Sequence, residues 1–181
     1  MRIVALMGKA GAGKDTILRY LCDHYDVHEI VSCTTRPPRQ GEVDGVNYFF
    51  LSNEEFATKV LNFEMLEATE FNGWFYGTDE TSLSANKINL GVFNPAGIDA
   101  LRENPHIDLT VIMVDATDKE RLIRQLNRED NPDVKEIIRR FKTDEEDFAE
   151  VEFDYIILNT DNTFPDNTNE LASLLLLGKI K

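Results

Sequence analysis

The segment Gly8–Thr16, with the sequence GKAGAGKDT, is the feature that most constrains the fold of this chain. It follows the apolar run Ile3–Met7 and precedes apolar residues at helical spacing, so it joins an expected buried strand to an amphipathic helix. Glycines let the backbone curl so that its N–H groups and the helix N-terminus face an anion. The spacing predicts a phosphate-binding loop rather than a turn that only caps a helix. The residues expected to hold a nucleotide's phosphates are Gly8, Ala10, Gly11, Ala12, Gly13, Lys14, Asp15 and Thr16.

Position 15 departs from the usual form of this motif, which has serine or threonine directly after the lysine to bind magnesium. Here Asp15 follows Lys14, and Thr16 comes behind it. Asp15 could interact favourably with the positive end of the helix dipole, contact magnesium through water, or point away from the nucleotide. Thr16 is the candidate metal ligand.

The chain is strongly acidic. Its 181 residues include 33 acidic and 19 basic side chains, which gives a net charge of −14. This balance argues against a nucleic-acid-binding protein, because such proteins neutralise many phosphates with basic residues. Many of the acidic residues lie in Asp144–Asp147 and Glu150–Asp154. We expect these residues to form the solvent-exposed face of a helix and the segment that follows its end. The length fits one domain with small appendages.

The cysteine content and the apolar runs bear on localisation. Cys22 and Cys33 are the only cysteines, and their spacing matches neither a zinc site nor a dense disulfide framework. No uninterrupted apolar stretch approaches the roughly 18 residues of a membrane span, and Met1 runs straight into the first expected strand, so we expect an unprocessed N-terminus. We therefore expect a soluble, cytoplasmic protein. The apolar segment Leu171–Leu177 is expected to be a core-packing last helix.

Strand and helix patterns alternate outside a central insertion, which favours a parallel sheet with crossover helices. A turn-rich segment with two prolines lies at 34–42, and residues 62–78 resemble two short strands around Asn72–Gly73. The polar segment 127–133 is either a connector or a mobile lid over a phosphate site. The expected strands are 3–7, 28–32, 46–51, two within 62–78, 88–93, 109–114 and 155–158; the expected helices follow Gly13 and Ser52, span 95–103, 118–126 and 134–148, and begin near Thr168.

Several motifs in the first half of the chain occur in the order known from one enzyme family. They are Ser32–Glu42 (SCTTRPPRQGE), Gly45–Phe50 (GVNYFF), Leu66–Glu67 and Phe75–Thr78 (FYGT). With the phosphate loop and the later α/β units, they resemble the guanylate kinase family over nearly the whole chain. The resemblance implies an α/β P-loop three-layer sandwich with a central parallel sheet. It also implies a core of 1–32, 83–126 and 139–181, a strand-rich acceptor-binding subdomain at 33–82, and a short lid at about 127–138.

The chemistry of the inserted residues fits this resemblance. A nucleoside monophosphate carries an almost doubly ionised phosphate, which paired arginines and tyrosine hydroxyls can hold. A carboxylate accepts from guanine N1–H and its amine, but faces a lone pair on adenine N1. Taken singly, these residues would more simply be surface charges, packing residues and turn residues; their joint appearance in the family's order favours the functional interpretation. The expected acceptor contacts are Arg36, Arg39, Tyr48 and Tyr76 on the phosphate, and Glu67, Ser32 and Thr78 on the base, the last three as the resemblance assigns them.

The second half departs from the family pattern. The family commonly has an Asp-x-Asp pair where this chain has Val92-Phe93-Asn94-Pro95. Asn94 can hydrogen bond to a base, but it cannot supply the missing negative charge, so guanine preference could be relaxed. The resemblance also suggests Asn159 for adenine, although this residue could instead belong to a turn.

The family lid is rich in arginine, and alignment favours Arg124 and Arg140 as the catalytic positions. Arg128 is offset in a lid without the family's glycine-rich form. Arg121 and Arg139 are either lid residues or surface arginines paired with local acids.

The resulting hypothesis is a kinase that transfers the γ-phosphoryl group of ATP to GMP or dGMP, with magnesium bound to ATP. Its expected partners are small molecules only, with no nucleic acid and no membrane, and the protein would be a monomer or homodimer. One alternative is a kinase with a broader or different monophosphate acceptor, as Asn94 and Asp15 suggest. The other is a non-catalytic binding module related to guanylate kinases.

Overall fold

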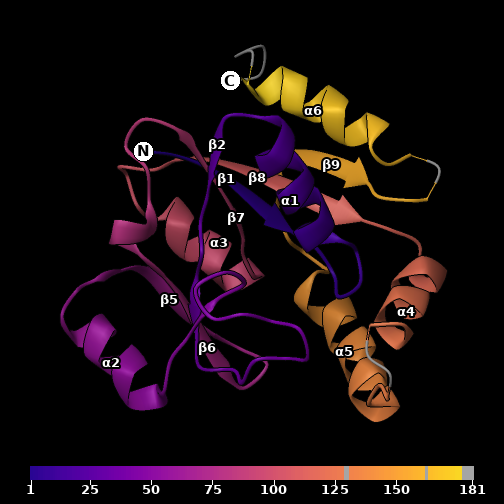
Figure 1. Ribbon diagram of the computed structural model, residues 1–181, viewed down its shortest axis with the longest axis horizontal. Helices are drawn as coiled ribbons and strands as arrows, with labels where there is room; N and C mark the ends of the chain where they lie inside the picture. Colours follow the sequence, from indigo (N-terminus) through magenta and orange to yellow (C-terminus); the bar gives the residue numbers. More distant parts are fainter. Residues whose placement is uncertain (129–130, 162, 177–181) are drawn as a thin grey trace. The chain divides into compact units, whose positions relative to one another are not determined.

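The computed structural model describes residues 1–128, 131–161 and 163–176 (Figure 1). Its helices are α1 (Lys14–His24), α2 (Asn53–Leu61), α3 (Pro95–Arg102), α4 (Asp118–Leu126), α5 (Val134–Asp147), α6 (Asp166–Leu176) and the short 3-10 helix η1 (Glu80–Ser82). Its strands are β1 (Arg2–Met7), β2 (Val27–Glu29), β3 (Cys33–Thr34), β4 (Phe49–Phe50), β5 (Met65–Phe71), β6 (Trp74–Asp79), β7 (Ile88–Val92), β8 (Asp108–Asp115) and β9 (Tyr155–Leu158).

The strands form two sheets. A five-stranded sheet has the order β2-β7-β1-β8-β9, and its pairs β2–β7 and β8–β9 are parallel. A four-stranded sheet has the order β4-β3-β6-β5. The α/β fold with a parallel sheet is therefore confirmed, and the inserted strands form a sheet of their own.

The chain divides into two compact units, each described by itself below. The first contains residues 1–5 and 26–110, and the second contains residues 6–25 and 111–181. The first unit thus includes β7 and α3 in addition to the strand-rich segment 33–82. The phosphate-loop segment, α4 and α5 belong to the second unit.

Local sequence signals explain the four-stranded sheet of the first unit. β5 and β6 pair through a hairpin in which Asn72 and Gly73 have φ values of 55° and 78°. Asparagine and glycine tolerate this left-handed conformation better than other residues, so the two strands predicted around them are confirmed and join in a tight hairpin. The helix predicted after Ser52 is also confirmed, because Ser52 and Glu55 form a reciprocal capping box at the start of α2.

The predicted strands 28–32 and 46–51 are both shorter in the structure, and the first is interrupted because the chain passes from one sheet to the other within it. Ile30 N–H donates to the carbonyl of Leu90, beside β7. Only two residues later, the Ser32 carbonyl accepts from Phe49 N–H at the start of the other sheet. A continuous strand over 28–32 was therefore wrong, and β2 ends at Glu29.

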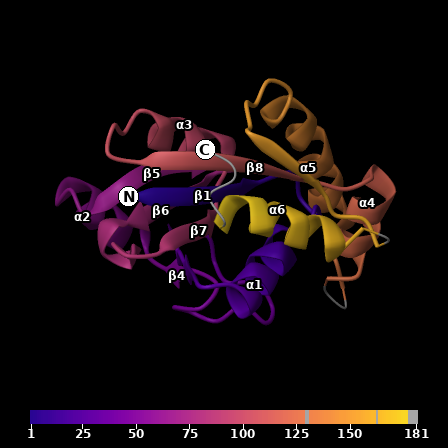
Figure 2. The ribbon, with the colours of Figure 1, turned by 90° about the horizontal axis from the view of Figure 1, so that it is seen from above.

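The second unit packs helices around the end of β1 and around β8 and β9. Figure 2 shows α6 lying alongside α1, where the hydroxyls of Tyr20 and Tyr25 both donate to Asn169 Oδ1. The predicted limits of α4 and β9 are confirmed, whereas α6 begins at Asp166, two residues before the predicted start. Leu171 and Ala172 are buried, as a core-packing helix requires, while Leu177 lies outside the described residues.

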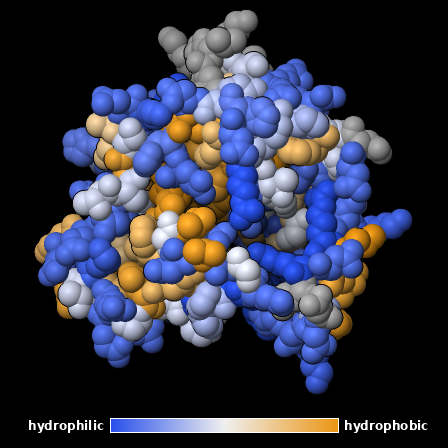
Figure 3. Space-filling view, in the orientation of Figure 1, coloured by the Kyte–Doolittle hydropathy of each residue, from blue (hydrophilic) through white to orange (hydrophobic). Residues whose placement is uncertain are grey.

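Hydrophilic residues cover most of the face seen in Figure 3, in keeping with the net charge of −14. Within the described ranges, no helix has both the length and the apolar character needed to cross a membrane.

Candidate active site

The phosphate loop of the second unit adopts a conformation that requires glycine. Gly11 and Gly13 have φ values of 80° and 91°, in the left-handed region that other residues rarely adopt. A Cβ atom on Gly11 would lie 2.5 Å from the carbonyl oxygen of Arg121, and one on Gly13 would lie 2.1 Å from Asn159 Nδ2. Gly13 is the N-cap of α1, so the helix N-terminus opens directly from the loop. This is the geometry of an anion-binding turn.

Lys14 is the first residue of α1 and reaches back over the loop. Its Nζ donates to the carbonyl oxygens of Gly8 at 2.7 Å and Lys9 at 3.3 Å. Burial lowers the pKa of Lys14, while Asp15 and Asp144 act in the opposite direction. The ammonium group therefore lies at the mouth of the loop, where a phosphate oxygen could replace the carbonyls.

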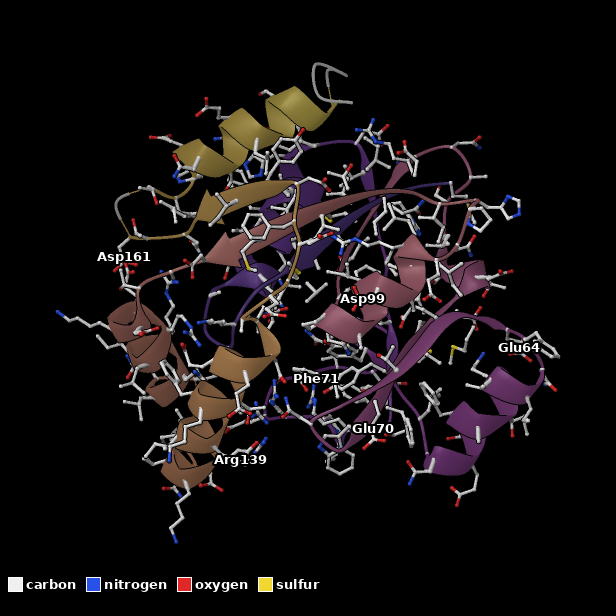
Figure 4. All side chains as sticks on the ribbon, turned by 180° about the vertical axis from the view of Figure 1, so that it is seen from behind. Glu64, Glu70, Phe71, Asp99, Arg139 and Asp161 are labelled. Atoms are coloured by element: carbon white, nitrogen blue, oxygen red, sulfur yellow. The ribbon has the colours of Figure 1, made fainter. Side chains whose placement is uncertain are left out.

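Asn159 and Arg124 both contact carbonyl groups of the loop. Asn159 is buried, and its Nδ2 donates to the Ala12 carbonyl over 2.7 Å. Arg124 Nη2 donates to the Asn159 carbonyl at 3.0 Å and pairs with Asp161 at 3.2 Å; Figure 4 labels Asp161 near α4. The side-chain amide of Asn159 thus braces the loop, which was not among its expected roles.

Asp15 and Thr16 lie in the first turn of α1 with exposed side chains. Thr16 N–H and Ile17 N–H both donate to the Gly13 carbonyl, which closes that turn. Within the described part of the chain, no three His, Cys, Asp or Glu side chains form a group that could hold a metal ion. The hydroxyl and the carboxylate are hard oxygen donors of the kind magnesium takes, one or two at a time, beside phosphate oxygens and water.

The expected lid spans 127–138, of which residues 129 and 130 lie outside the described residues. Arg128 follows α4, and its N–H donates to the Gln125 carbonyl. The last five residues of the expected lid, 134–138, belong to α5. Asp133 is the N-cap of that helix. Arg139 and Arg140 on α5 both bind Glu136, each through Nε at 2.7 Å. Arg139, labelled in Figure 4, is thus a partly exposed arginine paired with a local acid.

Arg121 and Asp144 differ from expectation. Arg121 is not a surface arginine, because it is 1% exposed and pairs with Asp144 at 2.7 Å. Asp144 is 5% exposed, so its expected place on a solvated helix face was wrong. Its oxygen also accepts from the Ala10 amide, and this contact draws the carboxylate inward.

In the first unit, sheet register brings together the three residues expected at the base. β5 and β6 pair with Glu67 opposite Thr78, and Thr78 Oγ1 donates to Glu67 Oε1 over 2.9 Å. Ser32 Oγ lies 3.4 Å from Thr78 Oγ1. All three residues are buried, at 7%, 0% and 8% exposure for Glu67, Thr78 and Ser32. The expected grouping is therefore present as a chain of contacts, in which Thr78 binds the Glu67 carboxylate and Ser32 lies beside Thr78.

Burial raises the pKa of Glu67 to about 7, and the hydrogen bond from Thr78 only partly offsets this. Only the ionised carboxylate can accept from both N1–H and the amine of guanine. We therefore expect the Kd for GMP to fall about tenfold between pH 6 and pH 8, as Glu67 ionises. Calorimetry in buffers of different ionisation enthalpy should also detect proton release on binding at pH 6.

The control for this pH prediction is Glu67→Gln, which keeps the ionisation of the GMP phosphate but removes that of the carboxyl group. Its remaining pH dependence belongs to the ligand, whose second phosphate pKa is about 6. An equal pH dependence of Kd in both proteins would contradict the assignment.

The expected phosphate clamp is organised by Glu42, which the sequence did not single out. Arg36 is 5% exposed, and its guanidinium lies 3.0 Å from Glu42. Arg39 N–H donates to the same carboxylate over 2.7 Å. Although burial opposes it, hydrogen bonds from Arg36 and Arg39 hold the pKa of Glu42 below its usual value. The carboxylate thus keeps the Arg36 guanidinium in place.

The two expected tyrosines lie beside this arginine. The guanidinium carbon of Arg36 lies 5.5 Å from the ring centre of Tyr48, within cation–π range. Tyr48 and Tyr76 meet edge to face with ring centres 6.1 Å apart. The structure therefore brings Arg36, Tyr48 and Tyr76 into one cluster, with Arg39 linked through Glu42.

Asn94 is the N-cap of α3, and this role occupies its oxygen. Oδ1 accepts from Gly97 N–H over 2.7 Å, while Nδ2 donates to Thr69 Oγ1 over 3.2 Å. A Cβ atom on Gly97 would lie 3.3 Å from both Asn94 Oδ1 and Glu67 Oε2, so Gly97 leaves space for the carboxylate. Asn94 therefore lies near Glu67, with its amide orientation set by the helix cap.

Comparisons with known proteins bear on the phosphate-loop residues and on the residues expected to bind the acceptor. A family model described as guanylate kinase matches residues 1–176. The chain belongs to the guanylate kinase family. A guanylate kinase of Fusobacterium nucleatum is 31% identical over 183 residues, covering 97% of this chain and 96% of that relative. A guanylate kinase of a Synechococcus species is 47% identical over 91 residues, which span 50% of this chain and about half (49%) of that relative.

Solved structures agree with this membership. The crystal structure of guanylate kinase from Anaplasma phagocytophilum matches with a TM-score of 0.73 and 26% identity, covering 99% of this chain and 86% of that one. The family resemblance and the fold predicted from the sequence are therefore confirmed. Within this family frame, Asn94, Asp15 and the lid segment are the departures that bear on chemistry.

Four residues of the site escaped prediction: Glu42, Thr69, Gly97 and Asp144. Asn94 followed by Pro95 is a typical helix start, so the capping role of Asn94 and its bond to Gly97 could have been predicted. Glu42 stands within the Ser32–Glu42 motif, but nothing in its spacing shows that it binds the arginines. Asp144 is one of several consecutive acidic residues, and no local pattern distinguishes the buried one.

Proposed function

We propose that the protein transfers the γ-phosphoryl group of ATP to GMP or dGMP, giving ADP and GDP or dGDP. Family membership supports an ATP-dependent kinase of this kind. The observation that carries the guanine assignment is the buried Glu67 carboxylate, which accepts from Thr78 and lies beside Gly97, where a side chain would crowd it.

The base-binding residues suit guanine because of their hydrogen-bonding roles. The Glu67 carboxylate can accept from N1–H and from the 2-amine, while a hydroxyl of Ser32 or Thr78 can donate to O6. Adenine would face Glu67 with the lone pair of N1 and leave a buried carboxylate oxygen without a donor. Sites built around such a bond reject the mismatched base strongly.

The transfer step needs no general base, because the accepting phosphate oxygen is already ionised. That oxygen forms a bond to the γ-phosphorus as the bond from phosphorus to the β–γ bridging oxygen breaks. Lys14, Arg124 and Arg140 would neutralise the transferred group, while Arg36, Arg39, Tyr48 and Tyr76 hold the acceptor phosphate. Positioning and charge neutralisation between two anions are the main tasks.

Magnesium fits the loop as a partner of the nucleotide rather than as a protein-held ion. Thr16 and Asp15 offer one hydroxyl and one carboxylate, and phosphate oxygens and water would complete the shell. When bound, the ion neutralises charge on the β- and γ-phosphates.

The test is a competition among acceptors. The purified protein is incubated with ATP, magnesium and equal concentrations of GMP, dGMP, AMP, CMP, UMP and dTMP, and the nucleoside diphosphates are identified by mass spectrometry. We expect GDP and dGDP, with ADP as the donor product whether or not AMP is present. Comparable yields of the pyrimidine diphosphates would refute the guanine assignment.

One observation favours a second candidate, a kinase with a broader acceptor range. Asn94 is uncharged, and its oxygen is committed to Gly97 N–H. We expect Asn94→Asp, which can still cap α3, to raise the preference for GMP over other monophosphates several-fold by adding a charged acceptor beside the base. Unchanged ratios of kcat/KM in this variant would remove Asn94 from base selection.

The proposed setting is the cytoplasm, with small-molecule partners, no nucleic-acid or membrane partner and a monomeric or homodimeric protein. The cysteine spacing and the acidic charge support this part of the proposal. The proposed organisation is a core of 1–32, 83–126 and 139–181, an acceptor subdomain at 33–82 and a lid at about 127–138.

A further inference from the structure

Ala10, at the start of the phosphate loop, is held through both of its backbone polar atoms. Its N–H donates to Asp144 Oδ2 over 2.8 Å, and its carbonyl accepts from Arg121 Nε over 3.1 Å. Arg121 Nη2 donates to the same Asp144 oxygen over 2.7 Å. The ion pair therefore closes a ring of hydrogen bonds around one residue of the loop.

The guanidinium of Arg121 is fixed by its other neighbours. Nη1 donates to Asp118 over 2.8 Å, and the guanidinium carbon lies 4.4 Å from the ring centre of Phe141. The carbonyl of Arg121 lies where a side chain on Gly11 would be, so the backbone of α4 is also packed against the loop. A group held in this way can define the position of the backbone it binds.

Fold stability alone is a weak explanation for this pair. Only 1% and 7% of the Arg121 and Asp144 side chains are exposed. Moving two charges out of water is costly, and apolar residues of similar volume often give an equally stable protein. An apolar pair could not, however, make the hydrogen bonds that Asp144 and Arg121 make to Ala10.

The effect on the loop follows from the direction of the Ala10 amide. Because this N–H donates to Asp144, it does not donate to a bound phosphate. Binding the phosphate is therefore left to the backbone amides nearer the start of α1. Asp144 also helps keep Lys14 charged, since it opposes the lowering of the pKa of that lysine by burial.

We infer that Asp144 and Arg121 are positioning residues: acting through Ala10, they hold the phosphate loop in the form that binds the phosphates of a nucleoside di- or triphosphate. This inference rests on the proposed function only for the class of ligand. It does not depend on which monophosphate is the acceptor.

The test is calorimetric binding of ADP and, separately, of GMP to the full-length protein and its variants. Arg121→Met with Asp144→Leu removes the Arg121 and Asp144 contacts to Ala10 without leaving a buried charge, and it keeps the longer contact of 3.4 Å from Gln125 Nε2 to the Ala10 carbonyl. We expect this double variant to keep its thermal midpoint within a few degrees and to bind ADP about tenfold or more weakly. Its GMP affinity should be unchanged, because the acceptor residues lie in the other unit.

Asp144→Asn provides a graded comparison, since its amide oxygen can still accept from Ala10 N–H. We expect its ADP affinity to lie between those of the wild type and the double variant. Glu146→Gln is the matched control, because it removes the same charge from an exposed position on α5 and should leave both affinities unchanged.

A folded double variant with wild-type ADP affinity would overturn the inference, and so would an equal loss of ADP and GMP affinity. If the double variant does not fold, Asp144→Asn decides, and an unchanged ADP affinity in that variant would also overturn it. Failure of the proposed function would be recognised separately, as wild-type protein that binds ADP but does not phosphorylate GMP.

Discussion

Lys14→Ala is expected to lower kcat/KM for phosphoryl transfer by about a thousandfold, because it removes a preorganised positive charge from the group in transfer. Nζ of Lys14 lies over the loop, within 2.7 Å of the Gly8 carbonyl. Removing a buried ammonium group should not destabilise the fold. Steady-state kinetics and a thermal melt on the same preparation check both expectations.

The matched control for this prediction is Lys9→Ala in the same loop. Lys9 Nζ pairs with Glu145 over 2.7 Å, and that carboxylate is largely exposed. We expect kcat/KM within about twofold of the wild type, since an exposed ion pair contributes little. Equal losses in the two variants would mean that Lys14 has no special part in the transfer.

Glu67→Gln is expected to lower kcat/KM for GMP by a factor of about 100 or more, because the amide presents a donor where the base also offers donors. The same variant should be more stable than the wild type at pH 8. The folded-state pKa of about 7 is above the ordinary 4.5, so the stability contributed by this carboxyl is present below pH 4.5 and lost as pH rises through 7.

The size of this stability change follows from the pKa difference. Ionising Glu67 in the folded protein costs about 3 kcal/mol of unfolding free energy above pH 7, and glutamine carries no such cost. Denaturant unfolding at pH 5 and pH 8 should therefore show a small difference at pH 5 and a gain for Glu67→Gln at pH 8. Glu70→Gln, an exposed position of the same strand labelled in Figure 4, should show neither effect. A gain at pH 8 no larger than that of Glu70→Gln would refute the burial of an ionisable carboxyl at Glu67.

The sequence was most informative where local chemistry determines structure. Ser52 with Glu55, Asn72 with Gly73, and the glycines of the phosphate loop each carry a backbone requirement that is visible from residue type alone. The same holds for the Glu67 and Thr78 pairing, because the hairpin at Asn72–Gly73 fixes the register of the two strands.

What the sequence could not provide were contacts between distant segments. Asp144 bonds to an amide 134 positions away, and nothing near it distinguishes it from its acidic neighbours. The end of β2 at Glu29 likewise depends on partner strands. Ile30 bonds to Leu90 of one sheet, whereas Ser32 bonds to Phe49 at the start of the other. Such long-range choices are decided by packing and hydrogen-bond pairing rather than by local pattern.

The central claim is that the phosphate loop and the residues expected at the base, Glu67, Thr78 and Ser32, serve one reaction. The most direct test is to incubate purified protein with ATP, magnesium and GMP and to quantify ADP and GDP by chromatography. The account predicts equal amounts of both products, and neither product when GMP is left out. Binding of GMP with no GDP formed, or ADP released without GDP, would contradict it.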